Sequence, residues 1–228
     1  MSAPFSIIIP TLNAASALPD TFEALLPGVE RGMIAQVIVS DGGSSDNTLE
    51  LSDALGAEII QGPPGRGGQL RRGAEQAHAP WLLFLHADTQ LPTTWTGALG
   101  THIAAHPEMA ATFRLAFRAR GLMAGLTASW ANLRTGWWDL PYGDQGLLIS
   151  RALYDQVGGY QDQPLMEDVA IARSLRGRIK LLDEVATTSA DRYLRQGWIK
   201  RGTSNLITLA RYAAGTSPQK LAQSYHKR

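Results

Sequence analysis

The sequence of 228 residues contains no cysteine. This absence excludes disulfide bonds, thiolate metal sites and cysteine nucleophiles, and it fits a reducing compartment. The most apolar uncharged stretch, residues 121–133, is shorter than the roughly 20 apolar residues that a membrane-spanning helix needs. The first residues lack the basic segment of a secretory signal. We therefore expect a cytoplasmic protein without a membrane-spanning segment.

Acidic residues are missing from the end of the chain. All 20 lie at or before Asp191, and from Arg192 onward eight lysines and arginines follow, an asymmetry that the net charge of +1 hides. A segregated basic tail suggests contact with phosphates, either on a ligand or on the anionic inner face of the cytoplasmic membrane. A solvated tail helix without a partner is the alternative. Nucleic acid is not expected, because no recognised binding module is present and the rest of the chain is acidic.

Hydrophobic residues make up 44% of the chain, which is enough for the core of one large domain. Short apolar runs alternate with helical patterns, and this alternation predicts an α/β fold whose mostly parallel central sheet has helices on both faces. We expect one domain over residues 1–190, and a basic, helical extension over residues 191–228 that packs on or beside it. The predicted strands are 5–9, 36–40, 58–60, 81–85, 109–117, 146–150 and 179–182. The predicted helices are 17–26, 47–55, 69–77, 121–133, a short one ending at 158–159, and 167–175, and an aromatic loop is expected over 137–144.

Ligands of open parallel sheets bind beyond the carboxyl ends of the strands. The second strand is followed directly by Asp41, and Gly42 and Gly43 then let the backbone turn tightly. Such a carboxylate can accept hydrogen bonds from a nucleobase or a ribose. A turn or helix cap that happens to be rich in aspartate and glycine is the structural alternative.

Glycines and arginines follow the third strand, where residues 62–68 are expected to form a loop before a helix. Glycines expose backbone N–H groups, and Arg66, Arg71 and Arg72 add positive charge, so this segment could bind phosphate. It is not a P-loop, because the Gly-Lys-Ser/Thr ending is missing. A flexible loop with a basic helix face is the alternative.

Two further acidic segments complete the pattern. His86 and Asp88 follow the fourth strand at a spacing that points both side chains the same way on an extended backbone. Asp88 is a candidate ligand for a divalent cation, and His86 either binds a softer ion such as Mn²⁺ or orients Asp88. Glu167 and Asp168 stand at a predicted helix start, where the helix dipole keeps a carboxylate ionised, as a base requires. Helix capping, for Asp88 and for the acidic pair, is the alternative.

Together these segments resemble the family 2 glycosyltransferases of the GT-A fold. The resemblance runs from Ser6 to about Leu182, with four motifs in the order of the family. They are the opening strand and turn (6–13), the nucleotide-recognition strand end (39–48), the position of the Asp-x-Asp metal motif (86–88) and the late acidic motif (167–168). Residues 142–146 also resemble a compact bacterial subgroup known as radical-SAM/selenium-associated transferase 2, a label that names no reaction.

The resemblance implies a metal-dependent hexosyltransferase that uses a UDP- or GDP-sugar, and we expect an inverting transfer. Asp168 would be the general base with Glu167 beside it, and Asp88, with His86, would bind Mn²⁺ or Mg²⁺ at the diphosphate. The nucleotide-binding residues that it implies are Pro10, Thr11, Asn13, Asp41, Gly42, Arg66 and Arg71.

The chain departs from the family pattern at two places. His86 stands where the metal motif has its first aspartate, and the Gln-x-x-Arg-Trp motif of processive enzymes is absent, so a polymerising enzyme is not expected.

An acceptor is expected at the aromatic loop, although a packed lid is equally compatible with its sequence. The candidate residues are Trp138, Tyr142, Asp144 and Gln145, and the acceptor could be a sugar, a lipid phosphate or a small molecule. The competing hypothesis is a non-catalytic nucleotide-sugar-binding protein that kept the fold. A nucleotide-sugar pyrophosphorylase or a dinucleotide-binding dehydrogenase would need a glycine-rich loop after the first strand, and residues 11–16 contain no glycine.

Overall fold

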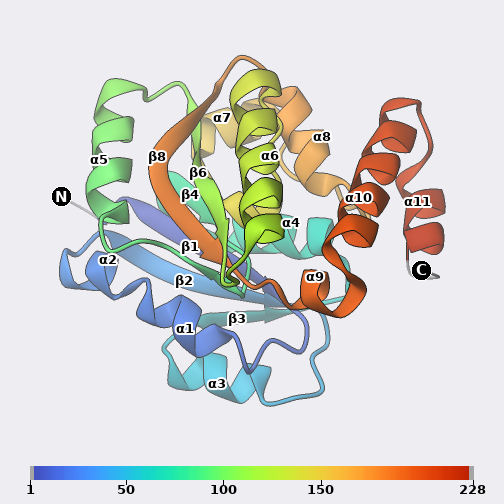
Figure 1. The fold of residues 1–228 in the computed structure, drawn as a ribbon. Coiled ribbons are helices and arrows are strands. Elements are labelled where there is room, and N and C mark those ends of the chain that lie inside the picture. Colours follow the sequence, from blue (N-terminus) through green and yellow to red (C-terminus); the bar gives the residue numbers. More distant parts are fainter. Residues whose placement is uncertain (1–2, 226–228) are drawn as a thin grey trace.

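The structure, a computed structural model that describes residues 3–225, contains a sheet of eight strands between layers of helices (Figure 1). The strand order across the sheet is β3-β2-β1-β4-β7-β6-β8-β5. The strands are β1 (Phe5–Thr11), β2 (Ile34–Asp41), β3 (Glu58–Gln61), β4 (Trp81–Phe84), β5 (Thr89–Gln90), β6 (Ala110–Phe117), β7 (Leu147–Ser150) and β8 (Ile179–Thr188). The helices are α1 (Leu18–Glu23), α2 (Leu26–Glu30), α3 (Thr48–Ala54), α4 (Arg66–Gln76), α5 (Trp95–Ala105), α6 (Leu122–Trp138), α7 (Arg151–Gln156), α8 (Glu167–Ser174), α9 (Asp191–Gln196), α10 (Trp198–Ala213) and α11 (Pro218–Tyr225), with a 3₁₀ turn η1 (Gly143–Gln145).

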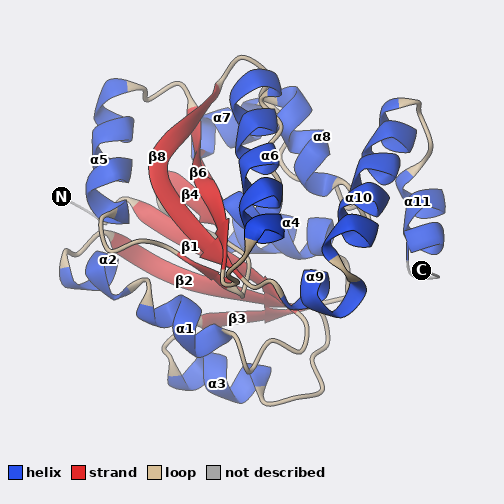
Figure 2. Cartoon of the chain, viewed as in Figure 1, coloured by secondary structure: helices blue, strands red, loops and turns tan. Residues whose placement is uncertain are grey.

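One half of the sheet is parallel. The strands β3, β2, β1 and β4 are neighbours that all run in the same direction (Figure 2). Successive residues of β1 enter different core clusters, since Ile7 and Ile9 pack on one face of the sheet and Ile8 on the other. An uninterrupted apolar strand is what a sheet covered on both faces requires. The predicted α/β fold is therefore confirmed.

The other half of the sheet is mixed. β7 is antiparallel to both β4 and β6, while β6 is parallel to β8. The first residue of β7, Leu147, pairs with Phe84, the last residue of β4. The chain before β7, residues 142–146, therefore lies at the edge where the parallel strands end.

Four of the predicted elements differ most from the observed ones. The predicted helix 17–26 is two helices, and Pro27 lies in the first turn of the second, where its missing N–H is tolerated. α4 begins at Arg66 instead of Gln69, and β8 continues to Thr188 instead of ending at Leu182. α6 continues to Trp138, so the first part of the predicted aromatic loop is helical. It ends where Asp139 adopts a left-handed conformation with a φ of 52°.

The basic end of the chain is helical in the described residues. α9 and α10 lie beside α6, and Phe117 makes edge contacts with Tyr193 and Trp198 (Figure 1). Leu221 of α11 is buried in a cluster with Val169 of α8. Among residues 3–225, no helix is both long enough and apolar enough to cross a membrane. The domain boundary at residue 190 stays a prediction.

Candidate active site

The carboxyl ends of β2, β1 and β4 form one edge of the sheet, with β1 in the middle. Asp41, the last residue of β2, is in register with Thr11, the last residue of β1. Asp88 follows the end of β4, on the other side of β1. Since neighbouring strands are about 4.8 Å apart, β2 and β4 are separated by about 10 Å. The two carboxylates therefore share the edge at which ligands of such sheets bind.

The Asp41 turn, residues 41–44, surrounds a fully buried carboxylate with hydrogen-bond donors. One oxygen accepts from the backbone N–H groups of Gly43 (2.7 Å) and Ser44 (2.8 Å). The other accepts from the hydroxyls of Thr11 (2.9 Å) and Ser44 (2.5 Å). Burial alone would raise the pKa of Asp41, but these hydrogen bonds outweigh it and lower the pKa below 3.8. Asp41 thus stays ionised and fixes the turn.

The residues expected around the nucleotide lie close to this turn. Pro10 is buried in β1, next to Thr11. Asn13 is exposed with a positive φ of 53°, and its side-chain oxygen accepts from the backbone N–H of Ser45 at 2.8 Å. Gly42 is tightly packed, because a Cβ atom there would approach Gln69 and the backbone of Pro64 to 3.1 Å. Together these contacts give the strand end a rigid shape.

Gln69, which the sequence analysis did not select, ties the two strand ends together. Its side-chain nitrogen donates to the carbonyl oxygens of Thr11 (2.6 Å) and Ser40 (2.9 Å). Arg72 also reaches this edge, donating to the carbonyl of Asp41 at 3.3 Å. Arg71 does not: it is exposed and paired with Glu75, one turn further along α4. The helical phase of α4 therefore brings Arg72 to the strand ends and directs Arg71 into solvent.

The glycines before and within α4 serve close packing. A Cβ atom on Gly67 would collide with the backbone oxygen of Gln161, and one on Gly68 with the carboxylate of Asp162. Both glycines are buried, so they let the segment 161–163 approach the helix start. Both glycines thus serve packing, and phosphate binding by this segment stays a prediction. Arg66, between Gly65 and these glycines, extends to Glu167.

Glu167 and Asp168 form an acidic corner at the start of α8. The residue before them, Met166, has a left-handed conformation with a φ of 66°, which is strained for a non-glycine residue by about 1–3 kcal/mol. Glu167 is 1% exposed, and one of its oxygens pairs with the guanidinium of Arg66. Its other oxygen is buried without a protein hydrogen-bond partner. A buried acidic side chain therefore directly follows a strained residue, and backbone strain of this kind is typical of functional sites.

Asp168 has the opposite electrostatics to Asp41. Its oxygens accept from the backbone N–H groups of Val169 (2.8 Å) and Gly143 (3.2 Å). Burial and the negative charge of Glu167 raise the pKa of Asp168, and Arg66 only partly opposes them. A carboxylate with a raised pKa is a better proton acceptor than an ordinary one.

The turn η1 joins the acidic corner to the end of β4. Asp144 pairs with Nδ1 of His86 at 2.8 Å. Burial alone would raise the pKa of Asp144, but the hydrogen bond and charge of His86, with Arg66 and Arg192, lower it to about 2. A Cβ atom at Gly143 would collide with the ring of His86, so a glycine is needed there. His86 thus forms a pair with Asp144, a residue that is distant from it in the sequence.

Asp88 is held from the backbone side by an arginine that the sequence analysis missed. Arg118 donates to the carbonyl oxygen of Asp88 and to the carboxylate of Asp20, both at 3.1 Å. Thr188 lies 3.4 Å from the carboxylate of Asp88. Arg118 directly follows β6, so the strand-end rule that selected Asp41 and Asp88 would have found it if applied to that strand.

The described residues contain no group of three or more histidine or acidic side chains that could enclose a metal ion. Asp88 nevertheless offers one carboxylate at the ligand-binding edge, and no ion pair of that carboxylate is found in the described part of the chain. Mg²⁺ commonly binds to one or two carboxylates together with substrate phosphates. The carboxylate of Asp88 therefore fits a divalent cation whose other ligands include oxygens of a diphosphate.

A pocket lies beneath the acidic corner. Its lining includes His86, Tyr142, Gly143, Glu167 and Asp168, with apolar residues of β4, α4 and α8 below them. Tyr142, one of the expected acceptor residues, is therefore beside the acidic corner, and Asp144, another, follows Gly143, whose N–H donates to Asp168. The ring of Tyr142 stacks under the guanidinium of Arg134, whose carbon lies 3.4 Å from the ring centroid. Arg134 is buried, and its isolated charge in the otherwise uncharged sequence of α6 was the signal that could have identified it.

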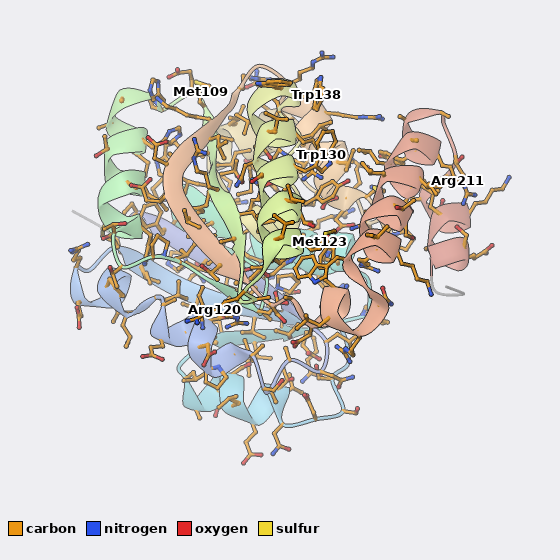
Figure 3. The ribbon with its side chains drawn as sticks, in the orientation of Figure 1. Met109, Arg120, Met123, Trp130, Trp138 and Arg211 are labelled. Atoms are coloured by element: carbon orange, nitrogen blue, oxygen red, sulfur yellow. The ribbon has the colours of Figure 1, made fainter. Side chains whose placement is uncertain are left out.

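The other two expected acceptor residues are absent from the residues that line this pocket. Gln145 is fully buried, accepting from the hydroxyl of Thr135 (2.8 Å) and donating to the carbonyl of Phe113 (3.0 Å). Its role is to hold the turn. Trp138 is the last residue of α6, is exposed, and lies at the opposite end of that helix from Arg120 (Figure 3). It packs on Trp130 and Trp137.

Comparison with known proteins gives a family match. The family model for glycosyl transferase family 2 matches residues 6–150. A PGL/p-HBAD biosynthesis glycosyltransferase of Mycobacterium bovis is 40% identical over 101 residues, which are 40% of this chain and 38% of that protein. Glycosyltransferase AglJ of Haloferax volcanii is 34% identical over 84 residues, 36% of this chain and 26% of that protein. The matched segments thus cover well under half the length of these relatives.

Solved structures share the fold at low identity. The structure of S. aureus TarS 1-349 in complex with UDP-GlcNAc has a TM-score of 0.65 at 18% identity, over 82% of this chain and 58% of that one. Glucosyl-3-phosphoglycerate synthase from Mycobacterium tuberculosis, with Mn²⁺ and UDP-glucose, has a TM-score of 0.57 at 18% identity, over 82% and 69%. These likenesses confirm the predicted GT-A fold.

Proposed function

The chain belongs to glycosyl transferase family 2, and from this premise we propose that it moves a sugar from a nucleotide-diphosphate sugar to an acceptor hydroxyl. The observation that carries the proposal is the meeting of three acidic groups at one edge of the sheet. The Asp41 turn and Asp88 flank the end of β1, and hydrogen bonds through residues 143–144 connect the acidic corner to the same edge. This arrangement suits a donor whose nucleotide lies near Asp41 and whose sugar lies near Asp168.

The proposed reaction is an inverting, single transfer. Asp168 accepts the proton of the acceptor hydroxyl while the hydroxyl oxygen attacks the anomeric carbon, and the nucleoside diphosphate leaves from the opposite face of the sugar. The raised pKa of Asp168 supports its role as the base, because it increases the affinity of the carboxylate for that proton. Arg66, paired with Glu167, holds positive charge beside the corner. The backbone N–H of Gly143 orients Asp168.

A divalent cation, Mn²⁺ or Mg²⁺, is part of the proposal. Asp88 would hold it, and His86 would help to orient the site through its pair with Asp144. When bound, such an ion neutralises the developing charge on the leaving diphosphate. The Mn²⁺ named with the synthase of similar fold supports this choice.

The donor and the acceptor are proposed only by class. UDP-sugars are named with two proteins of similar fold, which supports a UDP-sugar donor, and a GDP-sugar is the other candidate. Tyr142 and Asp144 are the proposed acceptor contacts, because Tyr142 lines the pocket with Asp168 and Asp144 follows Gly143, which donates to Asp168. Assignment to the radical-SAM/selenium-associated subgroup, a peripheral position on the membrane and a lipid phosphate held by the basic tail stay predictions.

The test is a thermal-shift screen of UDP, GDP and their sugars, with and without Mn²⁺ or Mg²⁺, followed by a release assay for the nucleoside diphosphate. A ligand at 100 times its Kd stabilises the fold by about 2.7 kcal/mol, so a true donor should raise the melting temperature. Release of nucleoside diphosphate that depends on the ion supports the transferase. Stabilisation without any release would favour the non-catalytic binding protein, and no response to any nucleotide would overturn both.

A further inference from the structure

One side of α6 exposes a row of large apolar side chains. The exposed fractions are 77% for Leu122, 54% for Leu126, 42% for Trp130, 38% for Leu133 and 70% for Trp137. At about 100° per residue, these five side chains fall within an arc of about 80° around the helix axis. We call this row, Leu122, Leu126, Trp130, Leu133 and Trp137, the apolar stripe.

The buried side of α6 consists of smaller residues. Ala124, Ala131 and Thr135 pack inward, and Arg134, the one charged residue of the helix, is buried. A helix on the surface of a globular protein normally directs its large apolar side chains into the core and its charged side chains into solvent. α6 does the reverse, so its exposed side matches an apolar surrounding better than water. Single exposed apolar residues are common, but a continuous row of this kind marks an interaction surface.

The helices beside α6 carry exposed basic residues. α10 packs against α6, and α9 precedes it (Figure 1). Arg195 and Lys200 are exposed on these two helices, close in sequence to the exposed apolar residues Leu194 and Ile199. No acidic residue occurs in the sequence after Asp191. In Figure 3, Met123, Trp130 and Trp138 lie along α6, with Arg211 of α10 across from them.

We propose that the apolar stripe of α6 docks the protein on the surface of an anionic lipid bilayer, with Arg195 and Lys200 at the headgroups. Tryptophan and leucine side chains on one helix side, flanked by basic residues, are the pattern of a helix that lies in the membrane interface. Basic residues near such a surface are attracted to anionic lipids. The helix lies on the membrane without crossing it.

Charge favours a bilayer over a second copy of the chain. In a symmetric dimer through the stripe, the basic residues of the two copies would be brought towards one another, and like charges at an interface oppose association. An anionic bilayer instead offers both the apolar layer for the stripe and the opposite charge for its basic flank. The bilayer is therefore the occupant that satisfies both observations.

Docking in this orientation would also bring the site close to the headgroups. Tyr193 of α9 contacts Phe117, and the next residue, Arg118, donates to the carbonyl oxygen of Asp88, so α9 borders the site. We infer that the acceptor is a sugar or phosphate group carried on a lipid. This second step depends on the proposed function, whereas the docking itself does not.

The experiment is co-sedimentation of the full chain with phosphatidylcholine vesicles, with and without phosphatidylglycerol. The variant Leu122→Glu/Leu126→Glu places two charges on the stripe. The matched control is Leu26→Glu/Val29→Glu, where the two side chains are 52% and 59% exposed, on α2, a helix that lies away from α6 (Figure 1). We expect the stripe variant to bind anionic vesicles at least about tenfold more weakly than the wild type, and the control to bind as the wild type does.

A second variant tests the contribution of the basic residues to vesicle binding. Arg195→Gln/Lys200→Gln should weaken binding to anionic vesicles at low salt and leave binding to neutral vesicles unchanged. Circular dichroism melting checks that each variant is folded. Equal vesicle binding by the folded stripe variant and the wild type would overturn the proposal. It would also be overturned by a lipid-free dimer that dissociates in that variant, which would assign the stripe to a second copy.

The acceptor step is tested separately in the wild type. Nucleotide-sugar binding is measured by thermal shift without lipid, so a failure of the proposed function appears there and not in the vesicle assay. If nucleotide binds, donor turnover is measured with vesicles containing a polyprenyl phosphate or a glycolipid, and with the same headgroups free in solution. Turnover that is equal for free and lipid-borne headgroups would refute the lipid acceptor.

Discussion

The Asp41 turn and the acidic corner hold their carboxylates in opposite ways. Asp41 is surrounded by four hydrogen-bond donors and has a lowered pKa. Asp168 has two backbone donors, lies beside the buried charge of Glu167 and has a raised pKa. Burial raises the pKa in both places, so the number of donors and the nearest charge decide the direction. One carboxylate is thereby fixed as a structural anion, and the other is poised to accept a proton.

The largest expected effect is that of Asp168→Asn on catalysis. Loss of a general base typically lowers the rate by about 10²–10⁴-fold, and we expect a loss of this size in the release of nucleoside diphosphate. Binding of the nucleotide should persist, because Asp41 and Asp88 are unchanged. The melting temperature at neutral pH should not fall, since the change removes a charge that burial and Glu167 disfavour.

The matched control for this variant is Asp155→Asn, an exposed aspartate of α7. It should leave both the release rate and the melting temperature unchanged. Full activity of Asp168→Asn, with its nucleotide binding intact, would exclude Asp168 as the base.

Asp41→Asn should have the opposite effect on stability. The two carboxylate oxygens of Asp41 accept from four donors, whereas an asparagine side chain has one acceptor oxygen. Hydrogen bonds to a charged group contribute about 1.5–3 kcal/mol each. We expect a loss of about 3 kcal/mol at neutral pH, measured by urea unfolding, together with weaker nucleotide binding. An unchanged midpoint would show that the turn does not depend on the carboxylate.

The pH dependence separates the two carboxylates further. The lowered pKa of Asp41 gives stability that is present above its unfolded value of 3.8 and is lost as the pH falls through the folded pKa. The deficit of Asp41→Asn should therefore shrink below pH 3.8. The raised pKa of Asp168 has the reverse sign, so the advantage of Asp168→Asn should appear as the pH rises above 3.8. Thermal melts across this range compare the two variants, and curves of the same sign would contradict the comparison.

Asp144→Asn tests how much a single neighbouring charge contributes to the stability of a carboxylate at this edge. Asp144 lies beside the acidic corner, yet His86 lowers its pKa to about 2. Its side chain is 35% exposed, so solvent screens the pair and we expect a loss of only about 1 kcal/mol at neutral pH. The loss should disappear as the pH falls from about 4 to 2, as urea midpoints would show. A loss that persists at low pH would mean that the pair is not its cause.

The smallest effect is expected from two neighbouring arginines of α4. Arg72→Gln removes a contact to the carbonyl of Asp41 and should weaken nucleotide binding severalfold. Arg71→Gln breaks only a solvent-exposed pair with Glu75, which is worth little, and should leave binding unchanged. Titration calorimetry compares them, and the reverse order would restore the original prediction for Arg71.

Local patterns predicted the parts of the site that follow strands. Asp41 and Asp88 were found because each follows a short apolar run, and the same rule would have found Arg118 after β6. The pair of His86 with Asp144 was not predicted, because it depends on how the chain returns from α6 into β7. Which of Arg71 and Arg72 reaches the strand ends depends on how α4 is rotated about its axis. The predicted start of this helix was three residues too late, so the sequence did not fix that rotation. The aromatic end of α6 was wrongly predicted as a loop, because the large apolar residues of this helix face outward instead of into the core.

The sequence by itself determined the α/β fold and the edge of the sheet at which the acidic groups gather. Buried parallel strands are uninterrupted apolar runs, and the residues after them must lie at one edge, so both features are local in the chain. Only the tertiary structure decided which carboxylate is fixed and which is ready to accept a proton. A pKa depends on donors and charges within a few ångströms, and Arg66 reaches Glu167 across 101 positions of sequence.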